Sequence, residues 1–127
     1  MTEYLPDLTT RRLLLRQPRQ EDAQEIARLA GDPEISANTL EIPYPTNERM
    51  ARDWISETEG KRDGRSDQVF MITDRSSGEI IGSIALMGFT REHSRAKIGY
   101  WIGRQFWNRG YATEAVCAVL DYGFRVM

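Results

Sequence analysis

Cysteine and histidine are almost missing from this sequence, which has one of each, Cys117 and His93, among its 127 residues. A single cysteine cannot close an internal disulfide, and no cysteine and histidine spacing typical of a metal site is present. The sequence therefore indicates neither a disulfide-stabilised fold nor a metal-dependent catalyst, and no metal is expected. Cys117 lies within a helical apolar pattern, so we expect it to be a small buried hydrophobic residue.

Long apolar runs and extended blocks of like charge are also missing. Without an apolar stretch of about eighteen residues or the basic and apolar regions of a signal peptide, the sequence predicts a cytoplasmic protein. The formal net charge is only −2, so neither nucleic acid nor a membrane surface is an expected partner. With 40% hydrophobic residues, a chain of this length suits one soluble domain.

The first half of the chain has the pattern of one strand and two helices. Residues 10–16 have the apolar content of a strand, and residues 21–30 repeat apolar side chains at the spacing of a helix. Three prolines make residues 33–45 a predicted loop, of a length that often contributes to binding. Thr46 is then expected to cap a second helix.

The second half changes to the pattern of strands. Residues 69–73 and 79–89 are predicted strands on either side of a turn rich in Asp, Ser and Gly, and residues 96–102 form a further strand. A loop leads into a last predicted helix over residues 113–127. This order of elements predicts the α+β class, with an antiparallel sheet flanked by helices.

One segment carries the clearest functional signal. From Ile98 to Ala115 it reads Ile-Gly-Tyr-Trp-Ile-Gly-Arg-Gln-Phe-Trp-Asn-Arg-Gly-Tyr-Ala-Thr-Glu-Ala, which predicts a strand, a loop with arginine and glycine, and the start of a helix. The first N–H groups of a helix have no partner within it and lie at the positive end of its dipole. The segment therefore predicts a site for phosphate groups.

Together with the opening Thr-Arg-Arg-Leu-Leu-Leu-Arg of residues 10–16, this segment resembles the GNAT superfamily of acyl-coenzyme A dependent N-acetyltransferases, in particular the branch related to RimJ and RimL. The pyrophosphate signature of the family is Gln or Arg, two residues, Gly, one residue, then Gly or Ala. Its positions correspond to Trp107, Gly110 and Ala112, of which Trp107 departs from the general form. The resemblance implies a mixed, mainly antiparallel GNAT-like sheet within a single domain over residues 1–127.

The resemblance also implies acetyl-coenzyme A as co-substrate. Gly110 would let the backbone approach the pyrophosphate, Ala112 would keep the helix start open, and Arg109 with Arg104 would add charge-assisted hydrogen bonds. The preceding strand would pair with the pantetheine arm and direct an N–H at the thioester oxygen. The implied cofactor-binding residues are Trp101, Ile102, Gly103, Arg104, Trp107, Asn108, Arg109, Gly110, Tyr111, Ala112 and Thr113.

The implied reaction is direct attack on acetyl-coenzyme A by a primary amine, either a protein N-terminus or a small molecule, in a ternary complex. Many relatives carry Glu in the strand sequence Ala-Glu-Ile-Gly-Tyr, where this chain has Lys97. Glu92 and His93 in the preceding turn are weak candidates for the missing base. A non-catalytic or degenerate acetyl-coenzyme A binding module is the alternative function.

The end of the sequence bears on how the domain is completed. Members of the family continue with another strand, another helix and a closing hairpin, so the resemblance implies a domain that is incomplete at its C-terminus. A truncated chain, a homo-oligomer in which another copy supplies the missing half, and an inactive relic all fit the sequence. For the oligomer we expect Ile98, Trp101 and Val119 to face the contact between chains.

Overall fold

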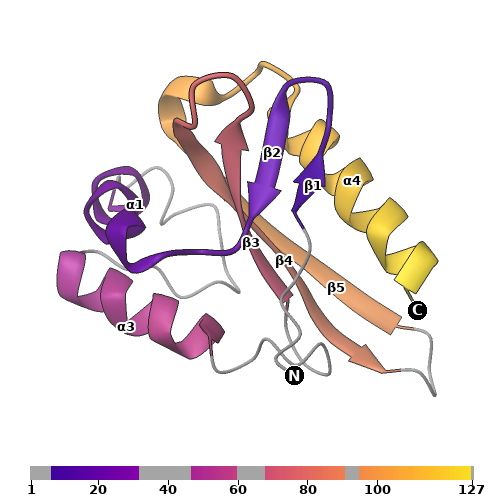
Figure 1. Ribbon diagram of the computed structural model, residues 1–127, viewed down its shortest axis with the longest axis horizontal. Coiled ribbons are helices and arrows are strands. Elements are labelled where there is room, and N and C mark those ends of the chain that lie inside the picture. Colours follow the sequence, from indigo (N-terminus) through magenta and orange to yellow (C-terminus); the bar gives the residue numbers. More distant parts are fainter. Residues whose placement is uncertain (1–6, 32–46, 60–67, 91–94, 127) are drawn as a thin grey trace.

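The computed structural model describes residues 7–31, 47–59, 68–90 and 95–126 (Figure 1). Within them, five strands form one antiparallel sheet in which the spatial order follows the chain order. Each strand therefore pairs with the strand before it in the sequence. Antiparallel neighbours of this kind can be joined by a short turn or by a longer segment that contains helices. The strands are β1 (Leu8–Thr9), β2 (Leu13–Arg16), β3 (Gln68–Asp74), β4 (Ile80–Thr90) and β5 (Arg95–Ile102).

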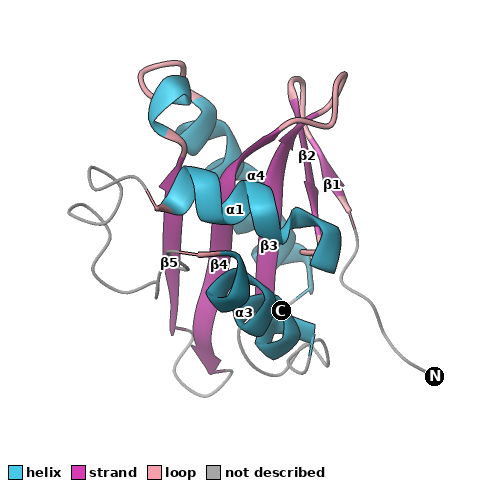
Figure 2. Ribbon diagram, turned by 90° about the vertical axis from the view of Figure 1, so that its left-hand side faces the viewer, coloured by secondary structure: helices cyan, strands magenta, loops and turns pink. Residues whose placement is uncertain are grey.

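Helices cover both faces of this sheet (Figure 2). Among the described helices, α1 and α3 share one face and α4 lies on the opposite face. Short 3-10 turns precede α1 and follow β5. The bounds are Gln20–Asp22 for η1, Ala23–Ala30 for α1, Glu48–Glu59 for α3, Arg104–Phe106 for η2 and Tyr111–Val126 for α4. The layers confirm the predicted α+β class.

The sheet separates two apolar clusters. Ile80 and Trp101 are buried beneath α1 and α3, whereas Val119 of α4 packs onto Phe70 and its neighbours on the other face. Trp101 is 2% exposed and Val119 is fully buried. The expectation that these two residues face another chain is therefore wrong, because both complete the core of their own chain. Ile98 is partly buried against the cluster beneath α4.

A bulge in β4 changes which of its side chains face each apolar cluster. Ile72 of β3 lies opposite Gly82, but the next residue, Thr73, lies opposite Ile80, so Ile81 is the extra residue in β4. Ile80 packs beneath α1 and α3, and Ile81 packs beneath α4. The additional residue thus changes the face on which the β4 side chains lie, as expected of a bulge.

The opening strand is shorter than predicted. Residues 10–16 were expected to form one strand, but a tight turn separates β1 from β2. In this turn the Thr10 N–H donates to the Leu13 carbonyl at 2.9 Å, and the Leu13 N–H donates to Thr10 Oγ1 at 3.0 Å. A threonine whose hydroxyl bonds to nearby backbone favours a turn over a continuous strand, which explains the difference.

The helix α3 begins with a side-chain cap. Asn47 Oδ1 accepts the N–H of Met50 at 2.8 Å, so one free donor of the first turn is satisfied. The predicted cap, Thr46, and the predicted loop over residues 33–45 lie outside the described residues. None of the described helices is both long enough and apolar enough to cross a membrane.

The orientation of α4 differs from the sequence expectation. The helix begins at Tyr111, two residues before the predicted start, and its buried face is formed by Ala115, Val119 and Tyr122. Cys117 lies away from this face and is exposed. The prediction that Cys117 is buried is wrong because the helix is apolar on more than one side, so composition alone does not identify the side that faces the sheet.

A buried ion pair joins β2 to the turn before α1. Arg16 donates to both carboxylate oxygens of Asp22, from Nη1 at 2.8 Å and from Nη2 at 2.9 Å. Asp22 Oδ2 also accepts the N–H of Arg19 at 2.8 Å. The side chains of Arg16 and Asp22 are only 10% and 8% exposed. The pair therefore fixes where the chain leaves the sheet and enters α1.

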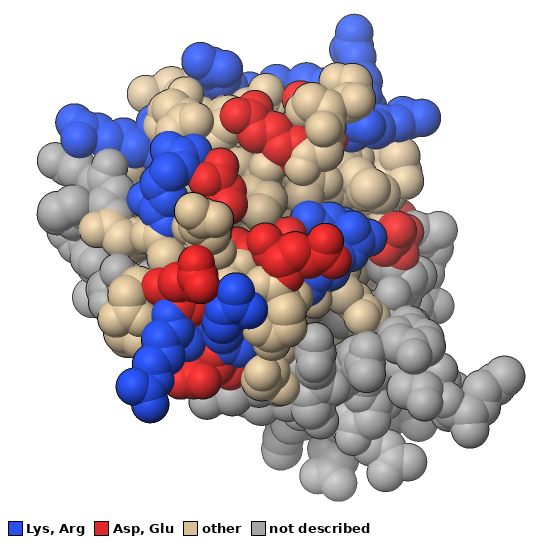
Figure 3. Space-filling view, turned by 60° about the vertical axis from the view of Figure 1, so that its left-hand side comes forward, with Lys and Arg blue, Asp and Glu red and all other residues tan. Residues whose placement is uncertain are grey.

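The surface formed by α1 and α3 carries interspersed acidic and basic side chains (Figure 3). Some of them form pairs along one helix, Glu25 with Arg28 in α1 and Glu48 with Arg52 in α3. Exposed pairs of this kind contribute little to stability. This face presents a mixed surface and no broad patch of one sign.

Candidate functional site

The outer edge of β5 offers backbone hydrogen-bonding groups. The Gly103 N–H donates to the Ile81 carbonyl at 2.8 Å, which makes these two residues a hydrogen-bonded pair. Because such pairs alternate along an antiparallel ladder, the N–H and C=O groups of Ile98, Tyr100 and Ile102 are directed away from β4. Among the described residues no further strand pairs with this edge. An extended ligand can therefore bind along it.

Trp107 supports the end of this strand. Its indole Nε1–H donates to the outward carbonyl of Ile102 at 2.7 Å, and its backbone N–H donates to the Arg104 carbonyl at 3.2 Å. The ring is partly buried and contacts both apolar clusters. The aromatic residue at this signature position thus has a structural role, and contact between Trp107 and a cofactor stays a prediction.

The loop that follows brings the chain to the helix start in an unusual backbone conformation. Asn108 has φ 64° and Gly110 has φ 80°, a region that asparagine and glycine adopt more readily than other residues. The Glu114 N–H donates to the Gly110 carbonyl, which closes the first helical turn. Within the described part of the chain, the N–H groups of residues 110–113 meet no acceptor. The loop and helix start therefore present backbone donors for an anion.

Packing fixes the base of this loop. Gly103 is buried, and a Cβ there would lie 3.1 Å from Leu29 Cδ2 and 3.2 Å from the Phe106 ring. Phe106 is itself buried and meets the Tyr111 ring edge to face, with centroids 6.2 Å apart. The loop is thus tied to α1 on one side and to α4 on the other.

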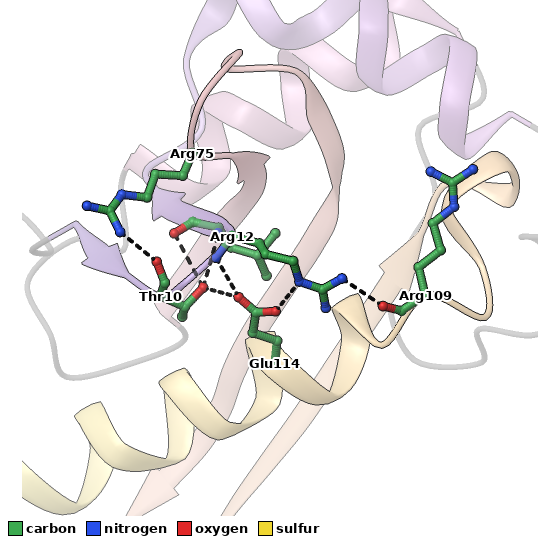
Figure 4. A network of polar contacts seen from close by, with 6 residues as sticks. Thr10, Arg12, Arg75, Arg109 and Glu114 are labelled. Carbon is green, nitrogen blue, oxygen red and sulfur yellow. Dashed lines mark hydrogen bonds and ion pairs between the residues drawn. The ribbon is translucent and has the colours of Figure 1, made fainter.

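A polar cluster connects the helix start to the turn between β1 and β2 (Figure 4). The Glu114 carboxylate accepts hydrogen bonds from the Thr10 hydroxyl, from the Arg12 N–H at 3.0 Å and from Arg12 Nε at 2.7 Å. Arg12 Nη1 donates to the Arg109 carbonyl at 2.9 Å. We call Thr10, Arg12 and Glu114 the turn cluster.

The environment of Glu114 lowers its pKa. Partial burial would raise the pKa, but the hydrogen bonds from Thr10 and Arg12, together with the charge of Arg12, outweigh it and hold the pKa below its ordinary value of 4.5. Glu114 is therefore an anion at neutral pH, and it is stabilised in that form by the fold.

This pKa shift predicts a pH-dependent contribution to stability. Because the pKa of Glu114 is lower in the folded chain, its contribution is present above pH 4.5 and is lost as the pH falls through the folded value. In urea unfolding at a series of pH values, Glu114→Gln should lose less stability on acidification than the unaltered chain. Glu21→Gln, which removes an exposed carboxylate of η1, is the control. Parallel pH profiles for Glu114→Gln and the unaltered chain would contradict the assignment.

The predicted catalytic candidates are not placed by the structure. Glu92 and His93 lie outside the described residues. The backbone of Lys97 lies in β5, opposite Met87. The predicted cofactor-binding residues, in contrast, are brought together: Trp101 and Ile102 end β5, Gly103 follows it, Arg104 begins η2, and residues 107–113 form the loop and helix start.

The comparison with protein families agrees with this geometry. A family model described as the acetyltransferase (GNAT) domain matches residues 12–127, which include the strands from β2 to β5, the loop and α4. The chain belongs to the GNAT acetyltransferase family. The resemblance inferred from the two sequence segments is thereby confirmed.

Curated GNAT relatives are longer than this chain. It is 36% identical over 118 residues to the uncharacterized N-acetyltransferase p20 of Bacillus licheniformis, a match that covers 92% of this chain and 65% of p20. It is 31% identical over 127 residues to the uncharacterized N-acetyltransferase YoaA of Bacillus subtilis, covering 96% of this chain and 68% of YoaA. The chain therefore spans about two thirds of the length of these relatives.

Solved structures share the fold at lower identity. RimL, a ribosomal L7/L12 alpha-N-protein acetyltransferase, superposes in its apo form with a TM-score of 0.81 at 16% identity, over 94% of this chain and 65% of RimL. The microcin C7 self-immunity acetyltransferase MccE, solved with acetyl-coenzyme A and AMP, gives 0.74 at 19% identity, over 89% and 63% of the two chains. Another RimL structure contains coenzyme A. These similarities establish the GNAT fold of this chain.

The turn cluster is the part of the site that the sequence did not reveal. Thr10 and Arg12 belong to the opening segment, and Glu114 belongs to the helix start. The resemblance rests on each of these two segments separately and does not indicate that they contact each other. Their contact joins residues about a hundred positions apart. A buried or paired acidic residue at a helix start has no signature of its own in one sequence, so only the fold identifies its partners.

Proposed function

We propose that this GNAT domain binds acetyl-coenzyme A and transfers its acetyl group to a primary amine of a protein N-terminus or a small molecule. The observation that carries the proposal is the loop and helix start, where the N–H groups of residues 110–113 meet no acceptor among the described residues. Gly110, at φ 80°, provides the backbone turn without a side chain in the way. These features fit a pyrophosphate, which needs many donors and close backbone approach.

The edge of β5 supports the same proposal. Ile98, Tyr100 and Ile102 direct backbone groups outward, and the Ile102 carbonyl is already taken by Trp107. The remaining outward groups suit an amide-containing arm such as pantetheine, and one N–H would polarise a thioester oxygen. Bound acetyl-coenzyme A would supply the activated acetyl group. The chain would contribute mainly by holding it in one orientation before the amine arrives.

A second candidate is a module that binds acetyl-coenzyme A without catalysis. Lys97 stands where many relatives carry Glu, so a plausible general base is replaced by a cation. In the described part of the chain, the carboxyl groups with a shifted pKa are Glu25, Asp74 and Glu114, and each pKa is lowered. A general base for an amine works best with a pKa near neutrality, so none of these three groups is favoured for that role.

Two measurements on the chain as it stands separate these candidates. Isothermal titration with acetyl-coenzyme A tests binding, and release of free thiol in the presence of a panel of amines tests transfer. Binding with amine-dependent thiol release supports the acetyltransferase. Binding without release supports the non-catalytic module, and the absence of binding contradicts both.

Arg109→Glu is expected to weaken acetyl-coenzyme A binding. The Arg109 side chain is exposed beside the helix start and extends away from Arg12 (Figure 4). Reversing its charge removes a charge-assisted hydrogen bond and adds repulsion, so the dissociation constant should rise by about tenfold or more. Arg49→Glu makes the same charge change at an exposed position of α3 and should leave the affinity unchanged. Equal affinities for both variants would remove Arg109 from the site.

A further inference from the structure

Arg12 makes all of its described side-chain contacts with the loop and the first turn of α4. Its Nε donates to Glu114 Oε1 at 2.7 Å, and its Nη1 donates to the Arg109 carbonyl at 2.9 Å (Figure 4). Its guanidinium lies 4.4 Å from the Tyr111 ring centroid. The donor comes from the turn between β1 and β2, at the other end of the chain. Arg12 thus connects the sheet to the predicted pyrophosphate loop.

The bond to the Arg109 carbonyl determines how the Arg109–Gly110 peptide group is oriented. In a trans peptide the C=O and the following N–H point in opposite directions, and no cis peptide bond occurs in the described chain. Because Arg12 holds the Arg109 carbonyl on its own side, the Gly110 N–H is directed to the other side. Arg12 therefore fixes a donor that the loop offers to a ligand, although it does not itself occupy that position.

Glu114 would by itself oppose an anion at this helix start. It lies in the first turn of α4, and a carboxylate there competes with a bound phosphate for the positive end of the helix. The Thr10 hydroxyl and two donors of Arg12 bind this carboxylate at the side of the helix that faces β1 and β2. The charge of Arg12 and the Thr10 hydroxyl therefore compensate the negative charge of Glu114, and Glu114 in turn anchors Arg12.

We propose that Arg12 is a positioning residue for coenzyme A: anchored by Glu114 and Thr10, it orients the Arg109–Gly110 peptide group so that the loop is preformed for the pyrophosphate. The inference rests on the proposed function. It differs from direct recognition, because the guanidinium is engaged by Glu114 and Arg109 and acts through the loop. A preformed loop binds its ligand more tightly because less ordering accompanies binding.

The test uses Arg12→Met, which keeps the aliphatic stem and removes the donors, and Arg12→Lys, which keeps the charge but not the planar fork. Arg11→Met removes the neighbouring exposed arginine and is the matched control. The dissociation constant for coenzyme A is measured by calorimetry, and backbone order in residues 108–113 is measured without ligand by nitrogen-15 relaxation. Urea unfolding confirms that each variant is folded under the conditions used.

We expect Arg12→Met to raise the dissociation constant by about tenfold or more and to lower the order parameters of residues 108–113 from about 0.85 toward 0.6 or less. The order parameters of β3 should not change. Arg12→Lys should recover little of the affinity, and Arg11→Met should bind like the unaltered chain.

Four results would overturn the inference. Unchanged affinity in Arg12→Met, or full affinity in Arg12→Lys, would show that the forked contacts do not position the loop, and in both cases the proposed function would stand. A loss of affinity with unchanged loop order would mean that Arg12 acts through its charge, on the ligand or by compensating Glu114, and does not position the loop. If the unaltered chain does not bind coenzyme A, the proposed function fails and this inference fails with it.

Discussion

Asp22→Asn is expected to lower the free energy of unfolding by about 3–5 kcal/mol, because it leaves the Arg16 guanidinium buried beside a neutral amide. Arg16 is 10% exposed and has little access to water that could replace the lost partner. Asparagine also provides only one acceptor oxygen, whereas the carboxylate accepts from Arg16 Nη1, Arg16 Nη2 and the Arg19 N–H. Urea unfolding at neutral pH measures the loss.

Two variants make this prediction specific. Glu25→Gln breaks an ion pair in α1 whose side chains are 57% and 36% exposed, and it should change stability by less than about 1 kcal/mol. The double variant Arg16→Met with Asp22→Leu removes both charges together and should recover most of the stability, because no buried charge remains unpaired. A loss for Asp22→Asn as small as that for Glu25→Gln would show that the pair does not hold β2 to η1.

Local chemistry explains which features the sequence could predict. Gly110 and the helix start after it were identified because a glycine in a loop and free helical N–H groups are properties of a short segment. The β3 to β4 connection was identified for the same reason, since Asp74 accepts the N–H groups of Ser76 and Ser77 within the turn itself. Such features depend on residues a few positions apart.

Features that depend on tertiary packing were missed or misjudged. Cys117 and Val119 both lie in an apolar part of α4, and only contact with the sheet decides that Val119 is buried and Cys117 exposed. The bulge at Ile81 and the contacts of Arg12 with the loop likewise require strands and helices to be placed first. The sequence thus predicts an anion site at the loop and helix start, but not the residues that fix the conformation of this loop.

Gly82→Ala is the second substitution for which we expect a large effect. A Cβ at this position would lie 2.1 Å from the Trp101 carbonyl oxygen and 3.0 Å from Ile102 Cα. Both are backbone atoms of β5, so no side chain can rotate to relieve the overlap. Relief requires β4 and β5 to separate at the point where β5 leads into the loop. We expect a loss of about 3 kcal/mol or more, at the upper end of the cost of overpacking.

The same substitution at another glycine provides the control. A Cβ at Gly123 in α4 would make an ordinary contact, 3.7 Å from Leu86 Cδ2, and alanine favours a helix over glycine by about 1 kcal/mol. Gly123→Ala should therefore raise the unfolding midpoint in urea, whereas Gly82→Ala should lower it.

Because Trp107 holds the Ile102 carbonyl, displacement of β5 would also disturb the loop, so Gly82→Ala should weaken coenzyme A binding under conditions where it remains folded. Equal unfolding midpoints for the two variants would mean that β5 accommodates a methyl group beside Trp101 without moving, and that its end is not held as closely as the register with β4 indicates.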